Sequence, residues 1–312
     1  MIAVDLGSNT FRAVALSCET LEPLAQYEKI VRTADRITET GKISKEAVNR
    51  IVAAAKEMRE RLDGTEEIVA VTTEAIRRAG NAGEVLEEID RRSGICFRVI
   101  SGEEEAKYTL LAVKTRLKKL RLESERFVMA DIGGGSTEIV FFDRGNILIE
   151  SFPVGIVTVA QRYRELARIE EALPSLMGEM RSHIEMAGHR GFQPKIFVAT
   201  AGTPTTVAAM KLGMEYATYD AGRVNGTLLN RDDLHAQLER LLSLGDEERQ
   251  RLVGVGREDL IAAGILIFDH LYRLLGFEEA VVIDDGLREG VAIAACRNLD
   301  INDLFSEKHL PA

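Results

Sequence analysis

The sequence predicts an α/β protein of two similar halves, because the same strand, glycine turn and strand pattern occurs twice. The clearer copy is the turn at residues 131–138, which lies between two apolar runs. Short apolar runs punctuated by glycine are typical of buried strands. The other copy, at residues 5–10, also starts with Asp and lies between apolar runs, and the later turn is one residue longer. A repeat of this kind predicts duplicated halves on either side of a nucleotide or phosphate cleft.

The turn at residues 131–138 has the composition of a phosphate-binding loop. Gly133, Gly134 and Gly135 have no Cβ atom, so their backbone can approach a ligand closely. Their amides, with the hydroxyls of Ser136 and Thr137, can form an anion-binding nest. One glycine turn alone also fits an ordinary hairpin, and the second copy favours the phosphate-binding interpretation.

Carboxylates stand at both ends of this turn. Asp131 begins it and Glu138 ends it. Carboxylate oxygens are the ligands that hard divalent cations prefer, so the two residues can hold a cation on a bound phosphate.

Composition limits the classes of partner. The chain has 312 residues, enough for two domains, and a net charge of −10. This charge argues against a duplex nucleic acid partner. An anionic substrate must then be held by local arginines, backbone amides or a metal ion.

The sequence predicts a cytoplasmic protein that does not enter a membrane. Cys18, Cys96 and Cys296 are scattered and odd in number, which indicates a reducing compartment. The first strand begins at Ile2, which leaves no room for a signal peptide, and the apolar run at residues 260–268 is too short to span a bilayer.

In the first half, further elements follow the first turn. A strand is expected at residues 27–31, and a helix is expected to start at the N-cap Ser44 and to stop at Asp63 and Gly64. The next strand, at residues 68–71, leads into Thr72 and Thr73 and then a helix that carries Arg77. Such a turn offers amides and hydroxyls to an anion, and the same residues equally fit an ordinary capped helix with an exposed arginine.

A strand at residues 97–100 precedes three glutamates, Glu103, Glu104 and Glu105, which open a helix. Acidic residues in a first turn ordinarily complement the helix dipole. The functional alternative is that one glutamate acts as a general base.

The second half repeats this plan. A strand at residues 147–149 is followed by a turn into a helix at Gly155, and residues 170–187 are expected to be helical. A strand at residues 195–199 leads to Gly202 and Thr203 at a helix start, a second candidate phosphate turn. Asn230 is expected to cap a helix, residues 260–275 to form a buried helix, and residues 281–283 to form the last strand. The final helix is expected after Gly290.

In its motifs and their order the chain resembles the exopolyphosphatase / guanosine pentaphosphate phosphohydrolase (Ppx/GppA) family. The resemblance rests on DIGGGSTE at residues 131–138, SGEEEA at 101–106 and GLREG at 286–290. It covers nearly the whole chain. It implies two actin-like, ribonuclease H-like domains of the ASKHA superfold around a central cleft, with expected bounds of 1–120 and 121–312. The resemblance leaves open whether the last helix packs on the first domain.

The resemblance also implies an activity, partners and a cofactor. Members release terminal phosphate from inorganic polyphosphate or from pppGpp, with Mg²⁺ or another divalent cation. Guanosine tetraphosphate is a further expected ligand, and a monomer or homodimer is expected.

Roles for individual residues follow from the same resemblance. Glu105 resembles the base that activates water, with Glu104 as its neighbour and substitute. Asp131 and Glu138, with Asp5, resemble the magnesium-binding carboxylates. The remaining matched positions would bind phosphate: Ser8, Asn9, Thr10, Arg12, Arg77, Gly133, Gly134, Gly135, Ser136, Thr137, Gly202, Thr203 and Arg257.

One feature departs from the longer members, which carry an additional helical C-terminal region. This chain stops at Ala312 and so resembles the short two-domain members, for which preference for very long polyphosphate is in doubt. Two alternative functions share the glycine loops. One is an actin-fold kinase, which Glu103 to Glu105 disfavour, and the other is a non-catalytic sensor of guanosine tetraphosphate or pentaphosphate.

Overall fold

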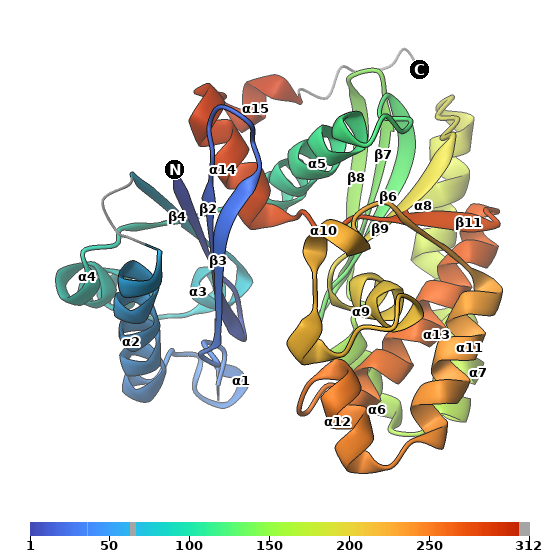
Figure 1. Ribbon diagram of the computed structural model, residues 1–312, viewed down its shortest axis with the longest axis horizontal. Coiled ribbons are helices and arrows are strands. Elements are labelled where there is room, and N and C mark those ends of the chain that lie inside the picture. Colours follow the sequence, from blue (N-terminus) through green and yellow to red (C-terminus); the bar gives the residue numbers. More distant parts are fainter. Residues whose placement is uncertain (36, 63–66, 306–312) are drawn as a thin grey trace. The chain divides into compact units, whose positions relative to one another are not determined.

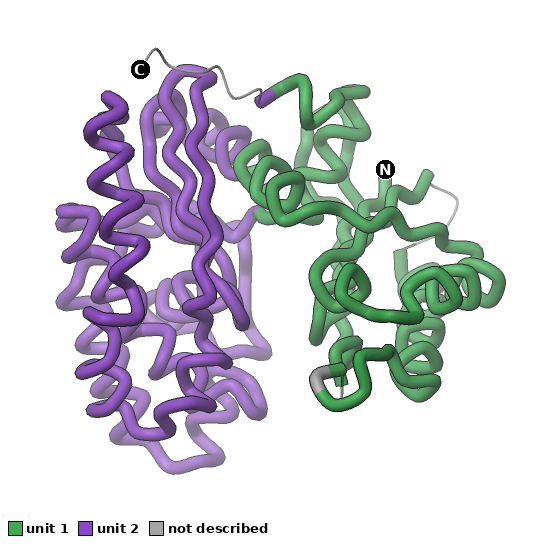
Figure 2. Tube along the Cα trace, turned by 180° about the vertical axis from the view of Figure 1, so that it is seen from behind, with its two compact units in different colours: residues 1–112, 286–304 green, residues 113–285, 305–312 purple. Residues whose placement is uncertain are grey.

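The computed structural model describes residues 1–35, 37–62 and 67–305 (Figure 1). The chain forms two compact units, coloured separately in Figure 2. Unit 1 contains residues 1–112 and 286–304, whereas unit 2 contains residues 113–285 and Phe305. Unit 1 is therefore built from both ends of the chain.

A five-stranded sheet forms the centre of unit 1, in the order β3-β2-β1-β4-β5. Strand β2 pairs antiparallel with both β1 and β3, whereas β4 pairs parallel with β1, and β5 pairs parallel with β4. Its strands are β1 (Ile2–Leu6), β2 (Thr10–Leu16), β3 (Pro23–Ile30), β4 (Ile68–Thr72) and β5 (Phe97–Val99).

Helices pack on both faces of this sheet. Ile2, Val4 and Leu6 alternate along β1 and join the buried core that includes residues of α2 and α4. Ala3 and Asp5 therefore point to the other face, where α14 contacts β1 and β2. The helices that contribute to unit 1 are α1 (Ile37–Thr40), α2 (Lys45–Arg61), α3 (Glu74–Arg78), α4 (Ala82–Ser93), the start of α5 (Gly102–Lys119), α14 (Leu287–Arg297) and α15 (Ile301–Leu304).

A six-stranded sheet forms the centre of unit 2, in the order β10-β11-β9-β6-β7-β8. The series β8-β7-β6-β9-β11 repeats the order and directions of β3-β2-β1-β4-β5, and β10 adds an antiparallel edge strand. The predicted duplication is therefore confirmed. The strands are β6 (Arg126–Ile132), β7 (Thr137–Asp143), β8 (Asn146–Phe152), β9 (Ile196–Thr200), β10 (Thr227–Asn230) and β11 (Glu279–Val282).

Helix α13 forms the centre of the helical layer of unit 2, where it contacts α6, α7, α9 and α11. Ile261, Ile265 and Phe268 on α13 are fully buried, as its apolar sequence predicts. Among the described residues, no helix is both long and apolar enough to cross a membrane. The helices of unit 2, besides the end of α5, are α6 (Ile156–Tyr163), α7 (Leu166–Leu176), α8 (Gly178–His189), α9 (Gly202–Lys211), the 3₁₀ helix η1 (Tyr216–Thr218), α10 (Ala221–Val224), α11 (Arg231–Ser243), α12 (Asp246–Val253) and α13 (Glu258–Leu275).

Both predicted helix caps are confirmed. The Ser44 side chain accepts a hydrogen bond of 3.1 Å from the Ala47 amide at the start of α2. Asn230 and Asp233 form a reciprocal capping box on α11, with hydrogen bonds of 2.8 and 3.0 Å. The predicted stop of α2 at Asp63 and Gly64 lies outside the described residues.

One detail of the sequence prediction is wrong. The helix expected after Gly290 is α14, which begins at Leu287, so Gly290 lies inside it. The second glycine turn is one residue longer than the first by the bounds of the strands, as predicted: residues 7–9 lie between β1 and β2, and residues 133–136 lie between β6 and β7. The strand pairing is nevertheless equivalent, because Leu6 pairs with Phe11 and Ile132 pairs with Thr137.

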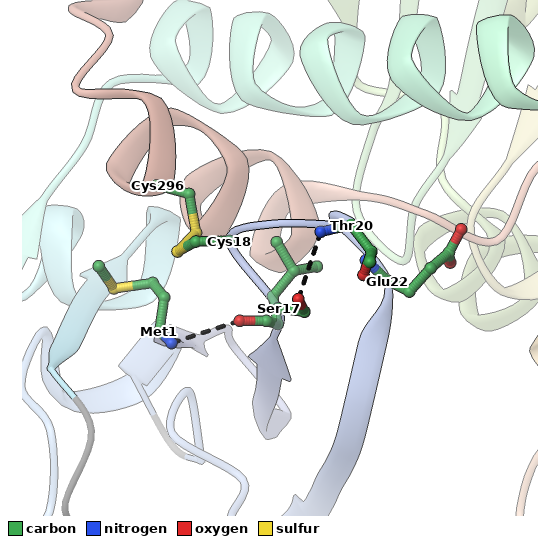
Figure 3. Close-up of a disulfide and its surroundings, with 7 residues drawn as sticks. Met1, Ser17, Cys18, Thr20, Glu22 and Cys296 are labelled. Carbon is green, nitrogen blue, oxygen red and sulfur yellow. Dashed lines mark hydrogen bonds between the residues drawn. A yellow bond between two sulfur atoms is a disulfide. The ribbon is translucent and has the colours of Figure 1, made fainter.

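The expectation of reduced cysteines is also wrong. Cys18, in the turn after β2, forms a disulfide with Cys296 on α14, and their Cα atoms are 5.1 Å apart (Figure 3). The two residues are 278 positions apart in sequence, so spacing gave no signal of the pairing. Cys96 is a free, exposed thiol. The bond joins the first hairpin covalently to the C-terminal segment that completes unit 1.

Reduction of this disulfide is expected to destabilise unit 1 by about 2–5 kcal/mol, because it releases a long closed loop in the unfolded chain. Urea unfolding with and without a phosphine reductant measures the change. The Cys18→Ser and Cys296→Ser variants should resemble the reduced protein, whereas Cys96→Ser should behave as the wild type. Three titratable thiols in the folded, air-oxidised protein, instead of one, would contradict the assignment.

Candidate functional site

Each unit gathers its candidate residues at the carboxyl ends of parallel strands. In unit 1, strands β1 and β4 pair in parallel, and this pairing places Leu6 opposite Thr72. Strand β5 pairs in parallel with β4. The turns after these strands carry Ser8 and Asn9, then Thr73, then Ser101. Parallel strands end at the same edge of a sheet, so residues far apart in sequence meet there.

Unit 2 repeats this arrangement. Asp131 on β6 pairs with Thr200 on β9, and β11 pairs with β9 in parallel. The glycine turn after β6, the start of α9 after β9 and the segment after β11 therefore lie at one edge of the sheet. The glycine turn of unit 2 and Gly202 thus lie at the same edge of this sheet.

The two glycine turns have the same backbone hydrogen bond. Gly7 N donates to Thr10 O at 3.0 Å, and Gly133 N donates to Ser136 O at 2.9 Å. This match makes Asp5 the counterpart of Asp131, and Arg12 the counterpart of Glu138.

Carbonyl groups of both turns accept hydrogen bonds from protein amides, whereas several amides of the turns donate no hydrogen bond to the protein. Asn9 O accepts from Val31 N and Arg32 N, and Gly134 O accepts from Val157 N. Among the residues that the structure describes, the amides of Ser8, Asn9, Gly134 and Gly135 donate to no protein group, and all four residues are exposed. Exposed, unpaired amides in a turn suit an anion.

Hydroxyl groups of the second turn bind protein atoms. Thr137 is fully buried, and its hydroxyl donates to Val154 O at 2.6 Å. Ser136 Oγ donates to Glu138 Oε1 at 2.6 Å, and Ser151 Oγ donates to the same oxygen at 2.6 Å. The amides, more than the hydroxyls, are therefore available to a phosphate in this turn.

Gly155 supports the turn from behind. A Cβ atom at Gly155 would lie 2.4 Å from Gly134 O and 2.4 Å from the carbonyl carbon of Gly135. Any side chain at position 155 must therefore displace the turn, a constraint that the sequence pattern did not reveal.

Asp131 and Glu138 are cross-strand partners on adjacent strands. Residues directly opposite each other in a sheet point to the same face. Among residues 1–35, 37–62 and 67–305, no group of three or more His, Cys, Asp or Glu side chains could hold a metal ion. Mg²⁺ is usually bound in proteins by one or two carboxylates together with substrate phosphates.

The carboxylate of Asp5 is only partly satisfied by protein. Its Oδ1 atom is buried and has no hydrogen-bond partner. Burial raises the pKa of Asp5 to about 6, against the opposing charges of Arg12 and Arg288, while Glu289 and Glu28 also raise it. A buried, unpaired carboxylate oxygen fits a cation, so the residues of unit 1 are compatible with a divalent metal at this position.

The start of α9 forms the second predicted phosphate turn. Arg257 donates from Nη2 to Thr206 Oγ1 at 3.1 Å, and the same nitrogen would lie 3.3 Å from a Cβ atom at Gly202. Arg257 therefore lies beside Gly202. Thr203 is fully buried and its side chain lies against Gly264 on α13, so only its backbone is available to a ligand.

Ala201, just before α9, has φ 71° and ψ −171°. A residue with a side chain rarely adopts this conformation, and such strain is concentrated at functional sites. No feature of the sequence indicates this backbone conformation.

Arg12 and Arg77 have protein partners in unit 1. Arg12 forms a half-exposed ion pair with Glu28, with Nε and Oε2 3.3 Å apart. Arg77 Nη1 donates to Ile100 O at 2.6 Å, which places Arg77 beside the turn between β5 and α5. Arg288 and Glu289 on α14, whose charges act on Asp5, were not predicted as site residues, although they belong to the GLREG motif.

The three glutamates of α5 have different surroundings. Glu103 is exposed and pairs with the buried Lys107. Glu104 accepts hydrogen bonds from Arg98 and from the Ser101 amide, at 2.6 and 3.0 Å. The Glu105 amide donates to Ser101 O at 3.0 Å and so lies in the first turn of the helix.

The raised pKa of Asp5 predicts a pH-dependent stability. The folded state binds this proton more tightly than the unfolded chain does, so its contribution is complete below about pH 4 and is lost as pH rises through 6. Without metal or phosphate, the Asp5→Asn variant should exceed the wild type in unfolding free energy by up to about 3 kcal/mol at pH 7.5, with little difference at pH 4. Urea unfolding across this range measures it. Asp90→Asn, at an exposed position of α4, is the control, and parallel curves for wild type and Asp5→Asn would refute the prediction.

Comparisons with known proteins agree with this geometry. Residues 11–298 match the model of the Ppx/GppA phosphatase family. Exopolyphosphatase 1 of Mycobacterium leprae is 26% identical over 95% of this chain and 88% of that protein.

Two solved structures are similar over nearly their whole length. The Ppx/GppA family member of Aquifex aeolicus has a TM-score of 0.77 and 29% identity, and covers 95% of this chain and 97% of its own. An exopolyphosphatase of Cytophaga hutchinsonii has a TM-score of 0.80 at 22% identity, covers 96% of this chain and 98% of its own, and supports the fold alone. Both units thus have the actin-like α/β fold, and the chain belongs to the Ppx/GppA phosphatase family.

Proposed function

We propose that this protein is a magnesium-dependent phosphohydrolase that releases the terminal phosphate of inorganic polyphosphate. The observation that carries the proposal is the pair of matching glycine turns, each with unpaired exposed amides at the carboxyl edge of a sheet. The similar protein of M. leprae is named an exopolyphosphatase, and the similarity extends over 88% of its length. Both facts favour polyphosphate as the substrate. The 5′-terminal phosphate of pppGpp is the second proposed substrate, since its triphosphate end has the same phosphoanhydride chemistry.

In the proposed reaction, a water molecule attacks the terminal phosphorus while the bond to the bridging oxygen breaks. Glu105 accepts the proton of the water, and the shortened chain leaves with the bridging oxygen. The amides of the two turns, with Arg12, Arg77 and Arg257, stabilise the charge on the phosphate oxygens. Asp131 and Glu138, with Asp5, would hold magnesium, which supplies further charge neutralisation.

Replacing the proposed base is the direct test. Glu105→Gln keeps the size of the side chain and removes the proton acceptor, so phosphate release should fall by roughly 10²–10⁴-fold. Release from long polyphosphate, short polyphosphate and pppGpp is measured with magnesium and with a chelator. Glu103→Gln, which changes an exposed neighbour, should remain active.

The outcomes distinguish three possible functions: a hydrolase, a sensor and a kinase. Magnesium-dependent release that is lost in Glu105→Gln supports the proposal, and the ranking of the substrates names the preferred one. Tight binding of guanosine tetraphosphate or pentaphosphate without release, unchanged in Glu105→Gln, would instead support a sensor. Transfer of phosphate to a small acceptor in place of water would support a kinase.

The close approach of Gly155 to the second turn gives an independent test. Gly155→Ala should displace Gly134 and Gly135 and so reduce kcat/KM for polyphosphate by about tenfold or more, since a displacement near 1 Å can cost about 100-fold. Steady-state kinetics at a temperature where the variant is folded provide the measurement. Gly188→Ala on α8, where an added Cβ meets nothing within 4 Å, is the matched control. Unchanged kinetics in Gly155→Ala would exclude this turn from substrate binding.

A further inference from the structure

The start of α5 is held by three side chains that are not part of the proposed chemistry. Arg98, on β5, donates from Nη1 to Glu104 Oε1 at 2.6 Å and from Nη2 to Tyr108 OH at 2.9 Å. One guanidinium therefore connects the end of a strand to the first and second turns of the next helix. Guanidinium groups suit this task because their donors are fixed in a planar fork.

Both oxygens of Glu104 accept hydrogen bonds. Oε1 accepts from Arg98, and Oε2 accepts from the Ser101 amide at 3.0 Å, while the Glu104 amide donates to Ser101 Oγ at 3.0 Å. The exchange between Ser101 and Glu104 is a capping box, which satisfies the free amides of a helix start. Partial burial raises the pKa of Glu104, but the hydrogen bonds from Arg98 and Ser101 outweigh it and hold the pKa below its ordinary value. Glu104 is thus engaged as a structural anion, which disfavours it as a substitute base.

Tyr108 anchors the other end of the network. Its side chain and backbone are 8% exposed in total, and a Cβ atom at Gly290 on α14 would lie 1.9 Å from Tyr108 O. The backbone of α14 therefore contacts α5 at this residue and leaves no room for α5 to shift toward it. Arg98 then connects the first turn of the helix to a second turn that is packed against α14.

Glu105 follows Glu104 directly, so its direction depends on this network. Successive residues of an α-helix are 1.5 Å apart along the axis and turn by a fixed angle, since 3.6 residues complete a turn. Once Glu104 is fixed on Arg98 and Ser101, the Cα–Cβ direction of Glu105 is also fixed relative to β5. Release of Glu104 would free the first turn to fray, as helix ends without caps do.

We propose that Arg98, Glu104 and Tyr108 are positioning residues that orient Glu105 for the attack of water. The inference rests on the proposed function, in which Glu105 is the base. It assigns no contact with substrate to the three residues.

The test compares kcat and KM for polyphosphate in Glu104→Ala, Arg98→Ala, the double variant and Tyr108→Phe. We expect kcat to fall about 10- to 100-fold in the first two, because a small misplacement of a catalytic group can cost about 100-fold. KM should change little. The double variant should lose less than the product of the two single losses, because both single changes remove the same Arg98–Glu104 interaction. Tyr108→Phe, which deletes only a hydroxyl, should lower kcat severalfold.

A matched pair controls for loss of an ion pair as such. Arg91 and Glu88 form an ion pair of 2.5 Å on α4 of the same unit, and Arg91→Ala and Glu88→Ala should keep wild-type kcat. All assays are run below the unfolding temperature of each variant. Arg98→Lys and Tyr108→Phe serve as milder changes if an alanine variant does not fold.

The pH profile distinguishes positioning from direct catalysis. In Glu104→Gln, the acidic limb of kcat should persist at lower amplitude, because the base is still present. Disappearance of that limb would make Glu104 the base and overturn the inference. Wild-type kcat in Glu104→Ala and Arg98→Ala, with only a lower unfolding temperature, would overturn it as well. Full activity of Glu105→Gln would refute the base assignment, and with it the premise, whereas loss of activity in Glu105→Gln with unchanged Glu104→Ala would overturn this inference alone.

Discussion

The parallel pairing of the first and fourth strands of each sheet is the constraint on which both candidate sites depend. Asp5 pairs with Val71 across β1 and β4, and Asp131 pairs with Thr200 across β6 and β9. These registers bring turns separated by about 65–70 residues to one edge of a sheet, as parallel strands require. A slip of one residue would move every side chain of a strand to the opposite face of the sheet, so the observed register determines where the turns lie.

Helix α14 is the second determinant, because it completes unit 1 from the far end of the chain. It contacts β1 and β2, its Gly290 lies against Tyr108 of α5, and Cys296 binds it covalently to Cys18. Arg288 and Glu289 at its start set the charge around Asp5. The chain passes from unit 1 to unit 2 within α5 and returns to unit 1 after Asp285. Within unit 2, Arg116 forms a bidentate ion pair with Asp285, with hydrogen bonds of 2.7 and 3.0 Å. Both ends of the chain thus contribute to the surroundings of a single buried carboxylate.

Local signals predicted the elements well and long-range contacts poorly. The glycine turns, the caps at Ser44 and Asn230 and the buried helix α13 follow from patterns within a few residues, because caps and amphipathic faces are local features. The pairing of Cys18 with Cys296 depends on the tertiary fold, and no spacing rule could reveal it. The start of α14 was misplaced because glycine usually ends or precedes a helix, whereas Gly290 is needed inside this one for close packing.

The candidate sites also show this difference between local features, which the sequence predicts, and packing, which it does not. The sequence did not predict that Arg257 lies beside Gly202, and it did not indicate that Thr137 and Thr203, two of the expected phosphate-binding residues, are buried. A threonine in a turn can satisfy the protein as well as a phosphate, and only the surrounding packing decides which. The strain at Ala201 and the support of the second turn by Gly155 are backbone properties, which residue identity does not report.

The two glycine turns have the same backbone hydrogen bond but carry opposite charges at one equivalent position. Position for position, Arg12 of unit 1 stands where unit 2 has Glu138. A cation beside unpaired amides attracts phosphate directly. A carboxylate at the equivalent place repels phosphate unless a divalent cation lies between them, since two anions in contact are otherwise unfavourable. Duplication therefore explains the common geometry of the turns. The exchange of one charge at equivalent positions then gives the turn of unit 2, but not that of unit 1, a side-chain carboxylate at both strand ends.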